Sequence, residues 1–226
     1  MNTAEHIVEL YYRFILNCFT ISDIKIPFGN NRQFDLLALK PKKENPQLFH
    51  VEIGVTHDER WTMDLDQLKN KFEYKFFGTV KEKITNSKRT DKAKGKNYFK
   101  PISEVYKNYG FNFEEVVRVY CIWHFKHNDE DFLLWRKNLA NDFKINENKI
   151  VLLSFRDTVL PELIKGIKTN NYDDDLLRIL SLLNQYELQT NKFVKSSITD
   201  SNIEKFFGRI NDNINLGEID NIIYGN

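Results

Sequence analysis

Two acidic residues, Asp35 and Glu52, stand inside two short apolar runs of the chain, FDLLAL and HVEIG. Between these runs lies KPKKENP, in which two prolines, an asparagine and several lysines indicate a hairpin or loop connection. A carboxylate is costly inside a buried strand unless it is paired or binds a cation. Two of them on neighbouring strands predict a divalent-metal site suited to chemistry on phosphates, because hard cations such as Mg²⁺ take oxygen ligands.

The alternation of side chains along an extended strand decides which residues accompany the two acids. Glu52 shares a face of its strand with His50 and Gly54, and Asp35 shares a face with Leu37. If the two strands are neighbours in the sheet, both carboxylates converge on one ion.

The hydrophobic pattern predicts the elements that must position these residues. Strands are expected at residues 21–28, 34–39, 48–55, 115–125 and 149–155. Helices are expected at residues 3–19, 58–83, 102–109, 129–143 and 158–167, with further helices beginning near 173 and 200. Three sequential strands with short connections favour an antiparallel meander, and the later strand-helix-strand alternation favours parallel pairing. The expected fold class is α/β, with a mixed central sheet flanked by helices.

Length and composition set the limits of this fold. The chain has 226 residues, of which 41% are hydrophobic, enough for one substantial core with an appended subdomain. We expect an α/β core over residues 1–170 and a C-terminal helical extension over residues 171–226. No apolar run approaches the roughly 18 residues of a membrane span, and no signal peptide is visible. Two distant cysteines, Cys18 and Cys121, fit a reducing compartment, so a cytoplasmic protein is expected.

Charge is distributed unevenly along the chain. The formal net charge is only +1, yet the segment from Lys81 to Lys100 carries eight basic and two acidic residues. Such a segment, with Ser, Thr, Asn and Gly interspersed, is typical of an exposed loop. It either grips a nucleic-acid backbone or is simply solvated, and the sequence leaves both interpretations open.

The order of the elements and the two acidic positions together resemble the PD-(D/E)xK nuclease superfamily, which has the restriction-endonuclease-like fold. The resemblance covers roughly residues 3–155. FDLLAL carries Asp35 at the position of the first motif acid, and HVEIG carries Glu52 at the position of the second. The resemblance implies a Mg²⁺-dependent (or Mn²⁺-dependent) nuclease that hydrolyses phosphodiester bonds in DNA, in restriction, phage defence or repair. Asp35 and Glu52 are then catalytic residues and metal ligands.

The resemblance also suggests supporting residues. Many members place a glutamate on the first helix, and Glu5 is preferred here over Glu9 as a further metal ligand. The helix after the third strand often contributes a polar residue to the site. Gln67 and Lys71, on one face of that helix together with Asp64, are the candidates for catalytic roles.

One position departs from the family pattern. The motif lysine normally lies two residues after the second acid, where this chain has Gly54. Three interpretations remain: a lysine of the following helix, such as Lys71 or Lys69, reaches the site; metal ions act without a lysine; or the site is degenerate and only binds.

Three functions therefore remain under consideration. The first is a nuclease that binds DNA through the segment from Lys81 to Lys100. The second is a catalytically degenerate nuclease fold that binds nucleic acid or protein. The third is an interaction protein without a nucleic-acid role. The apolar helices after Asp173 either form a homodimer interface or pack on the sheet, and the sequence leaves both interpretations open.

Overall fold

The computed structural model describes residues 2–27, 32–43, 45–55, 63–79, 98–124, 129–168 and 170–195. The chain divides into two compact units, Met1–Gly166 and Ile167–Asn226. The first unit contains the sheet and the candidate site, and each unit is described separately below.

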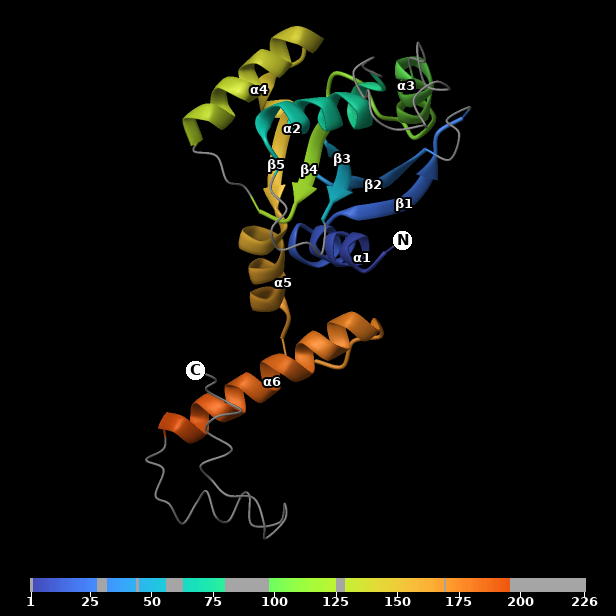
Figure 1. The fold of residues 1–226 in the computed structure, drawn as a ribbon. Helices are drawn as coiled ribbons and strands as arrows, with labels where there is room; N and C mark the ends of the chain where they lie inside the picture. Colours follow the sequence, from blue (N-terminus) through green and yellow to red (C-terminus); the bar gives the residue numbers. More distant parts are fainter. Residues whose placement is uncertain are drawn as a thin grey trace, which may run out of the picture. The chain divides into compact units, whose positions relative to one another are not determined.

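A mixed five-stranded sheet forms the centre of the first unit, in the order β1-β2-β3-β4-β5 (Figure 1). Its strands are β1 (Phe19–Lys25), β2 (Gln33–Lys40), β3 (Gln47–Gly54), β4 (Val117–Ile122) and β5 (Ile150–Ser154). The pairs β1–β2 and β2–β3 are antiparallel, whereas β3–β4 and β4–β5 are parallel. The expected meander, the parallel pairing and the α/β class are therefore confirmed.

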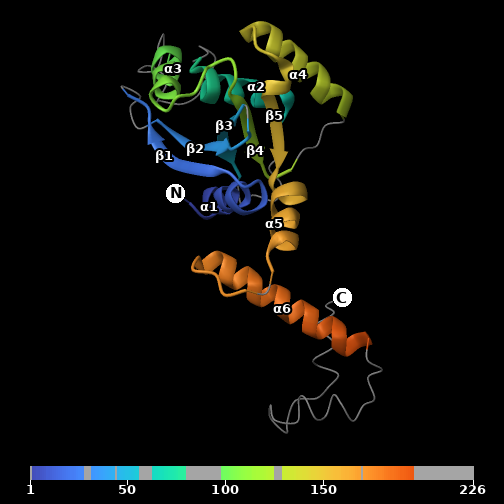
Figure 2. The ribbon, with the colours of Figure 1, turned by 180° about the vertical axis from the view of Figure 1, so that it is seen from behind.

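Helices cover both faces of this sheet (Figures 1 and 2). One face packs against α1 (Thr3–Leu10), its π-helical continuation η1 (Tyr11–Ile15) and the π-helical segment η5 (Phe155–Val159), which leads into α5 (Leu160–Gly166). The other face packs against α2 (Leu65–Phe72), its π-helical continuation η2 (Glu73–Phe77), α3 (Phe99–Asn108) and α4 (Asp129–Phe143). A 3-10 turn, η4 (Glu147–Lys149), precedes β5.

Burial on both faces explains the continuous apolar run of β4. Every residue of VRVYCI is buried, because β4 lies between two parallel neighbours and under helices on both faces. Parallel strands covered on both faces have continuous apolar runs rather than alternation. The one charged residue of the strand, Arg118, donates hydrogen bonds to the carbonyl oxygens of Val116 and Phe113.

Several helix boundaries differ from the sequence expectation. The first helix ends at Ile15 instead of residue 19, because Asn17 adopts a positive φ of 55° before β1 begins. The helix expected over residues 58–83 begins at Leu65, where the Asp64 carboxylate accepts a hydrogen bond from the Gln67 amide. It ends at Gly78, whose φ of 67° is readily adopted by glycine.

Aromatic packing fixes the α2–η2 helix on the sheet. Phe72 and Phe76 are fully buried, and their ring centroids are 4.3 Å apart. Phe76 also contacts the ring of His50 on β3 edge to face, at a centroid distance of 4.7 Å. Because these rings stand on one stripe of the helix, they set which of its residues face the end of β3.

The second unit is built around one helix, α6 (Asp175–Lys195). The Asp174 carboxylate caps it by accepting hydrogen bonds from the amides of Leu176 and Leu177, so the cap lies one residue after the expected Asp173. Ser181 and Asn184 donate hydrogen bonds to carbonyl groups of the preceding segment. The helix expected near residue 200 lies outside the described residues, and dimerisation through these helices stays a prediction.

Two further expectations concern the cysteines and the membrane. Cys18 and Cys121 are both buried and free of a disulfide. In the parts of the chain that the structure describes, no helix has the length and apolar character needed to cross a membrane.

The packing predicts that Phe76→Ala destabilises the first unit strongly. Truncating a fully buried Phe typically costs about 3–5 kcal/mol, because it removes apolar contacts and leaves a cavity. Urea denaturation followed by circular dichroism measures this loss. Leu134→Ala on α4, where the side chain is 61% exposed, is the matched control and is expected to change stability by less than about 1 kcal/mol. Equal losses in both variants would contradict the packing argument.

Candidate functional site

The site begins where β2 and β3 separate. Their antiparallel register runs from Lys40 opposite Gln47 to Leu36 opposite Val51. Beyond it, the Asp35 carboxylate accepts a hydrogen bond of 2.7 Å from the Ile53 amide. A side chain of β2 thus bonds to a β3 backbone group at the end of the ladder.

The two sequence-predicted acids lie on these neighbouring strands, and both are buried. Asp35 is 8% exposed and Glu52 only 1%. The central prediction from the sequence, that two carboxylates stand side by side on adjacent strands, matches this arrangement.

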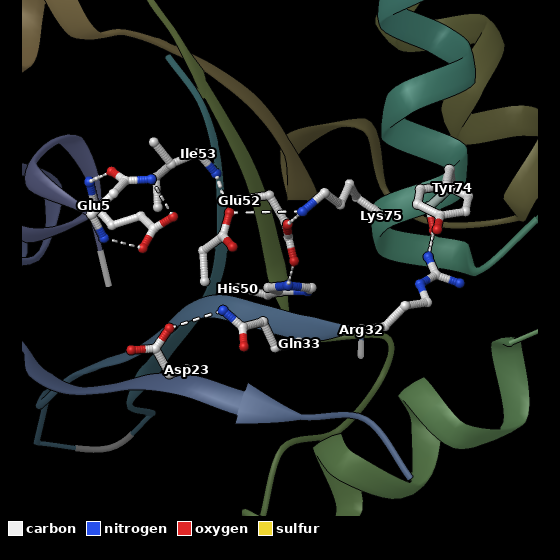
Figure 3. Close-up of polar contacts among 11 residues, drawn as sticks. Glu5, Asp23, Arg32, Gln33, His50, Glu52, Ile53, Tyr74 and Lys75 are labelled. Carbon is white, nitrogen blue, oxygen red and sulfur yellow. Dashed lines mark hydrogen bonds and ion pairs between the residues drawn. The ribbon is translucent and has the colours of Figure 1, made fainter. Parts of the chain in front are cut away.

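A lysine from the following helix approaches both acids. Lys75 lies on η2, and its ammonium group forms an ion pair with Glu52 Oε2 (Figure 3). Its Nζ atom is also 3.8 Å from Asp35 Oδ2. One of the three interpretations of Gly54 was a lysine supplied by this helix, but the residue in the pocket is Lys75 instead of Lys71 or Lys69.

A buried histidine orients Glu52 from the other side. His50 Nε2 lies 2.8 Å from Glu52 Oε1, and His50 Nδ1 lies 2.6 Å from the Tyr106 hydroxyl. An ionised carboxylate has no proton to give, so Nε2–H donates to Glu52 and Nδ1 accepts from the tyrosine. Burial, followed by the charge of Arg118, holds the pKa of His50 well below its usual range, which keeps the ring neutral. Glu52 is therefore fixed at both oxygens, by His50 and Lys75.

Burial also controls the protonation of the two acids. It raises the pKa of Asp35 to about 7, and the neighbouring Glu52 charge adds to the effect. Burial raises the pKa of Glu52 as well, although Lys75 opposes this shift. For Lys75, burial opposes the charged form, but Glu52 and Asp35 outweigh it and raise the pKa. The cluster therefore holds a charged lysine whose ion pair favours the ionised form of Glu52, beside an Asp35 whose pKa lies near neutrality.

Gly54 is required by the tyrosine opposite the site. Tyr120 pairs with Glu52 across the β3–β4 ladder and is 3% exposed. A Cβ atom at position 54 would lie 2.4 Å from the Tyr120 hydroxyl and 2.9 Å from its Cζ atom. The phenol ring thus occupies the space that a side chain at position 54 would need, and the cation comes from the helix.

Asp35, Glu52 and Lys75 line a pocket of about 400 Å³. It is lined by Ile26, Arg32, Gln33, Asp35, Glu52, Tyr74 and Lys75. The pocket brings together acids from two strands, a lysine from a helix and an arginine that precedes β2. Gln33 is held by the Asp23 carboxylate, to which its side-chain amide donates a hydrogen bond of 3.0 Å (Figure 3).

Three sequence-predicted site residues do not line this pocket. Glu5 forms a capping box with Asn2 on α1, which covers the sheet face opposite to α2. Gln67 is exposed in the first turn of α2, where its amide bonds to the Asp64 cap. Lys71 is exposed one turn before Lys75. The alternative Lys69 forms an ion pair with Asp142, at 2.6 Å.

The residues missed from the sequence are Lys75, Arg32 and the His50–Tyr106 pair. A weak signal existed for Lys75, because it flanks the apolar stripe of Phe72 and Phe76, but Lys71 flanks the same stripe one turn earlier. Which lysine reaches the acids depends on how far along the sheet the helix lies. No local sequence pattern indicated that Tyr106 contacts His50, because Tyr106 lies on α3, 56 residues further along the chain.

The donor set is compatible with a hard divalent cation. Asp35 and Glu52 supply carboxylate oxygens, and across the described residues no third His, Cys, Asp or Glu joins them to form a larger ligand group. Mg²⁺ is commonly held by only one or two carboxylates, with water and substrate phosphates completing its shell. The titrating Asp35 fits this use, because a cation stabilises two ionised carboxylates at close range.

Comparisons with known proteins identify no relative: no protein-family model matches the chain, and neither curated proteins nor solved structures give a significant match.

The close approach at Gly54 predicts a clash that depends on Tyr120. Gly54→Ala is expected to destabilise the protein by about 1–3 kcal/mol, because overpacking forces buried groups to shift. In a Tyr120→Ala background the same substitution is expected to cost much less. Urea denaturation of the four proteins of this double-mutant cycle measures the coupling. Additive effects would show that the tyrosine does not exclude a side chain at position 54.

The raised pKa of Asp35 predicts a pH-dependent stability. Its folded value of about 7 exceeds the ordinary value near 3.9, so its contribution is full below about pH 4 and is lost as the pH rises through 7. Relative to Asp35→Asn, the wild type is expected to lose on the order of 2 kcal/mol between pH 5 and 7.5. Urea denaturation in EDTA measures both proteins. A difference in unfolding free energy between the two proteins that stays constant with pH would contradict the raised pKa of Asp35.

Proposed function

We propose that this chain is a divalent-metal-dependent nuclease that hydrolyses phosphodiester bonds in DNA. The observation that carries the proposal is the convergence of Asp35, Glu52 and Lys75 in one pocket, from β2, β3 and η2. Two acidic side chains and one lysine at the end of a buried strand are the functional groups that the PD-(D/E)xK site uses.

The order of elements supports the restriction-endonuclease-like assignment of the core. A helix precedes an antiparallel three-stranded meander, and a helix on the opposite face follows it before the parallel strands β4 and β5. The acids stand on the second and third strands, where the resemblance expects them. Lys75 supplies the missing motif cation from a different element, which accounts for Gly54.

Each residue of the pocket has its own role in the proposed reaction. Asp35 and Glu52 would hold Mg²⁺ or Mn²⁺, which when bound lowers the pKa of water and offsets charge on phosphoryl oxygens. His50 holds the Glu52 carboxylate in one orientation through its Nε2–H group. Lys75 carries a full positive charge on a flexible side chain and stabilises negative charge that develops on the phosphate. Phe76 and Phe72 keep its helix in place.

Binding of DNA through the segment from Lys81 to Lys100 stays part of this proposal. Residues 81–97 lie outside the described residues, so their basic side chains add only the sequence argument. A role in restriction, phage defence or repair rests on the family resemblance alone.

A degenerate binding module is the second candidate, and one contact favours it. The ion pair between Lys75 and Glu52 satisfies a buried carboxylate without any metal ion. A fold that had lost catalysis would retain such a pair for stability. The two candidates differ in whether metal-dependent cleavage occurs at all.

Cleavage of linear, supercoiled and single-stranded DNA with Mg²⁺ or Mn²⁺ tests the proposal. Asp35→Asn, Glu52→Gln and Lys75→Met are each expected to lower the single-turnover rate by about 100-fold or more, because each removes charge stabilisation of the transition state. Glu104→Gln and Lys107→Met, exposed on α3, are the matched controls and should cleave like the wild type.

Lys71→Met separates the lysine expected from the sequence from the lysine in the pocket. The proposal expects a far smaller effect from Lys71→Met than from Lys75→Met. Wild-type protein that binds DNA but cleaves no substrate with either metal would favour the binding module. A fully active Lys75→Met variant would remove Lys75 from the mechanism while leaving the metal site in place.

A further inference from the structure

Arg32 is a second cationic group of the pocket, and it is held apart from the acids. Its guanidinium carbon lies 3.9 Å from the ring centroid of Tyr74 and 4.5 Å from that of Tyr98. Its Nη2 atom donates a hydrogen bond to the Tyr74 carbonyl oxygen. Figure 3 shows the guanidinium directed at Tyr74, separate from the pair formed by Lys75 and Glu52. Two rings and a backbone group therefore fix its position.

Among the residues that the structure describes, no anionic group contacts this fixed charge directly. Within the described residues no carboxylate forms an ion pair with Arg32, and its Nη1 atom is buried there without a hydrogen-bond partner. Burial lowers the pKa of Arg32, which expresses the cost of removing the guanidinium from water. A protein keeps such a charge at a cost in stability unless a ligand supplies the missing anion.

The charge balance of the pocket points the same way. Lys75 and Arg32 place two cationic side chains opposite the two carboxyl groups of Asp35 and Glu52 in the pocket lining. A divalent cation at the two acids would therefore leave the pocket with a net positive charge. The pocket as a whole is thus suited to an anion.

Phosphate is the anion that fits an arginine held in this way. The planar guanidinium donates parallel hydrogen bonds to two phosphate oxygens, and aromatic rings that pack on its faces preorganise it. Sulfate-like or carboxylate ligands share part of this chemistry. A polyanionic strand is favoured because the arginine shares its pocket with a second, separate cationic site at Lys75.

We propose that Arg32 binds a backbone phosphate of the nucleic-acid strand next to the phosphate that is cleaved, with Tyr74 and Tyr98 holding the guanidinium in place. This inference rests on the proposed nuclease function and adds a substrate-binding subsite to it. Arg32 then contributes mainly to binding and register, whereas Lys75 and the acids act at the reacting phosphate.

Binding measured without cleavage tests this subsite. Fluorescence anisotropy with a labelled DNA duplex in Ca²⁺ and in EDTA compares wild type, Arg32→Gln, Arg32→Lys and the control Arg13→Gln, which changes an exposed arginine of η1. Loss of charge-assisted hydrogen bonds to one phosphate is expected to weaken binding about 10- to 100-fold in Arg32→Gln. In Arg32→Gln, the plot of the logarithm of the association constant against the logarithm of the salt concentration should become shallower by about one. Arg32→Lys should keep the wild-type slope.

A set of duplexes, each with one neutral methylphosphonate linkage, identifies the phosphate. At one position, the neutral linkage is expected to weaken binding by the wild type without changing the affinity of Arg32→Gln. That position should lie next to the mapped cleavage site. Circular dichroism melting of each variant verifies folding. Arg32→Gln that binds like Arg13→Gln, or that loses affinity equally at every linkage, would overturn the subsite.

The two proposals fail in different ways. Cleavage by the wild type combined with unchanged binding by Arg32→Gln would remove the subsite and leave the nuclease. Intact, Arg32-dependent binding to one phosphate without any cleavage would remove the nuclease and keep the phosphate site of a binding module.

Discussion

The arrangement of the first unit depends on the burial of two carboxylates at the end of a sheet. Asp35 and Glu52 are both almost fully buried, so the surrounding elements supply partners for them. The Ile53 amide bonds to Asp35, while His50 and Lys75 hold the two oxygens of Glu52. Ile53 and His50 belong to β3 and Lys75 belongs to η2, so the site depends on both the strand register and the position of the helix.

Aromatic packing holds the partners of the two acids in place. The rings of Phe72 and Phe76 anchor α2 and η2 on the sheet, and Phe76 packs on the same His50 that orients Glu52. Tyr106 then connects His50 to α3. Because His50 and Tyr106 are themselves buried in the core, Glu52 stays in position without depending on a bound ion.

The pocket holds two positive charges in different surroundings. Lys75 is paired with the acids, whereas Arg32 is held by tyrosine rings and lacks an anionic partner among the described residues. A lysine on a flexible side chain suits a charge that must follow the reaction, and a guanidinium fixed by rings suits a stationary phosphate. The same pocket thus accommodates both the nuclease and the binding-module interpretation, which differ only in whether metal-dependent cleavage follows binding.

Sequence alone determined the order of the elements, the antiparallel and parallel halves of the sheet, and the pairing of Asp35 with Glu52. These features follow from local periodicity, and an acid inside an apolar strand is a strong local signal because its burial is costly. Tertiary structure decided that Lys75 rather than Lys71 meets the acids, that Tyr120 excludes a side chain at position 54, and that Arg32 joins the pocket. These contacts join residues far apart in the chain. They depend on which strands are neighbours and on where a helix rests on the sheet, and both are set by packing in three dimensions that no local spacing records.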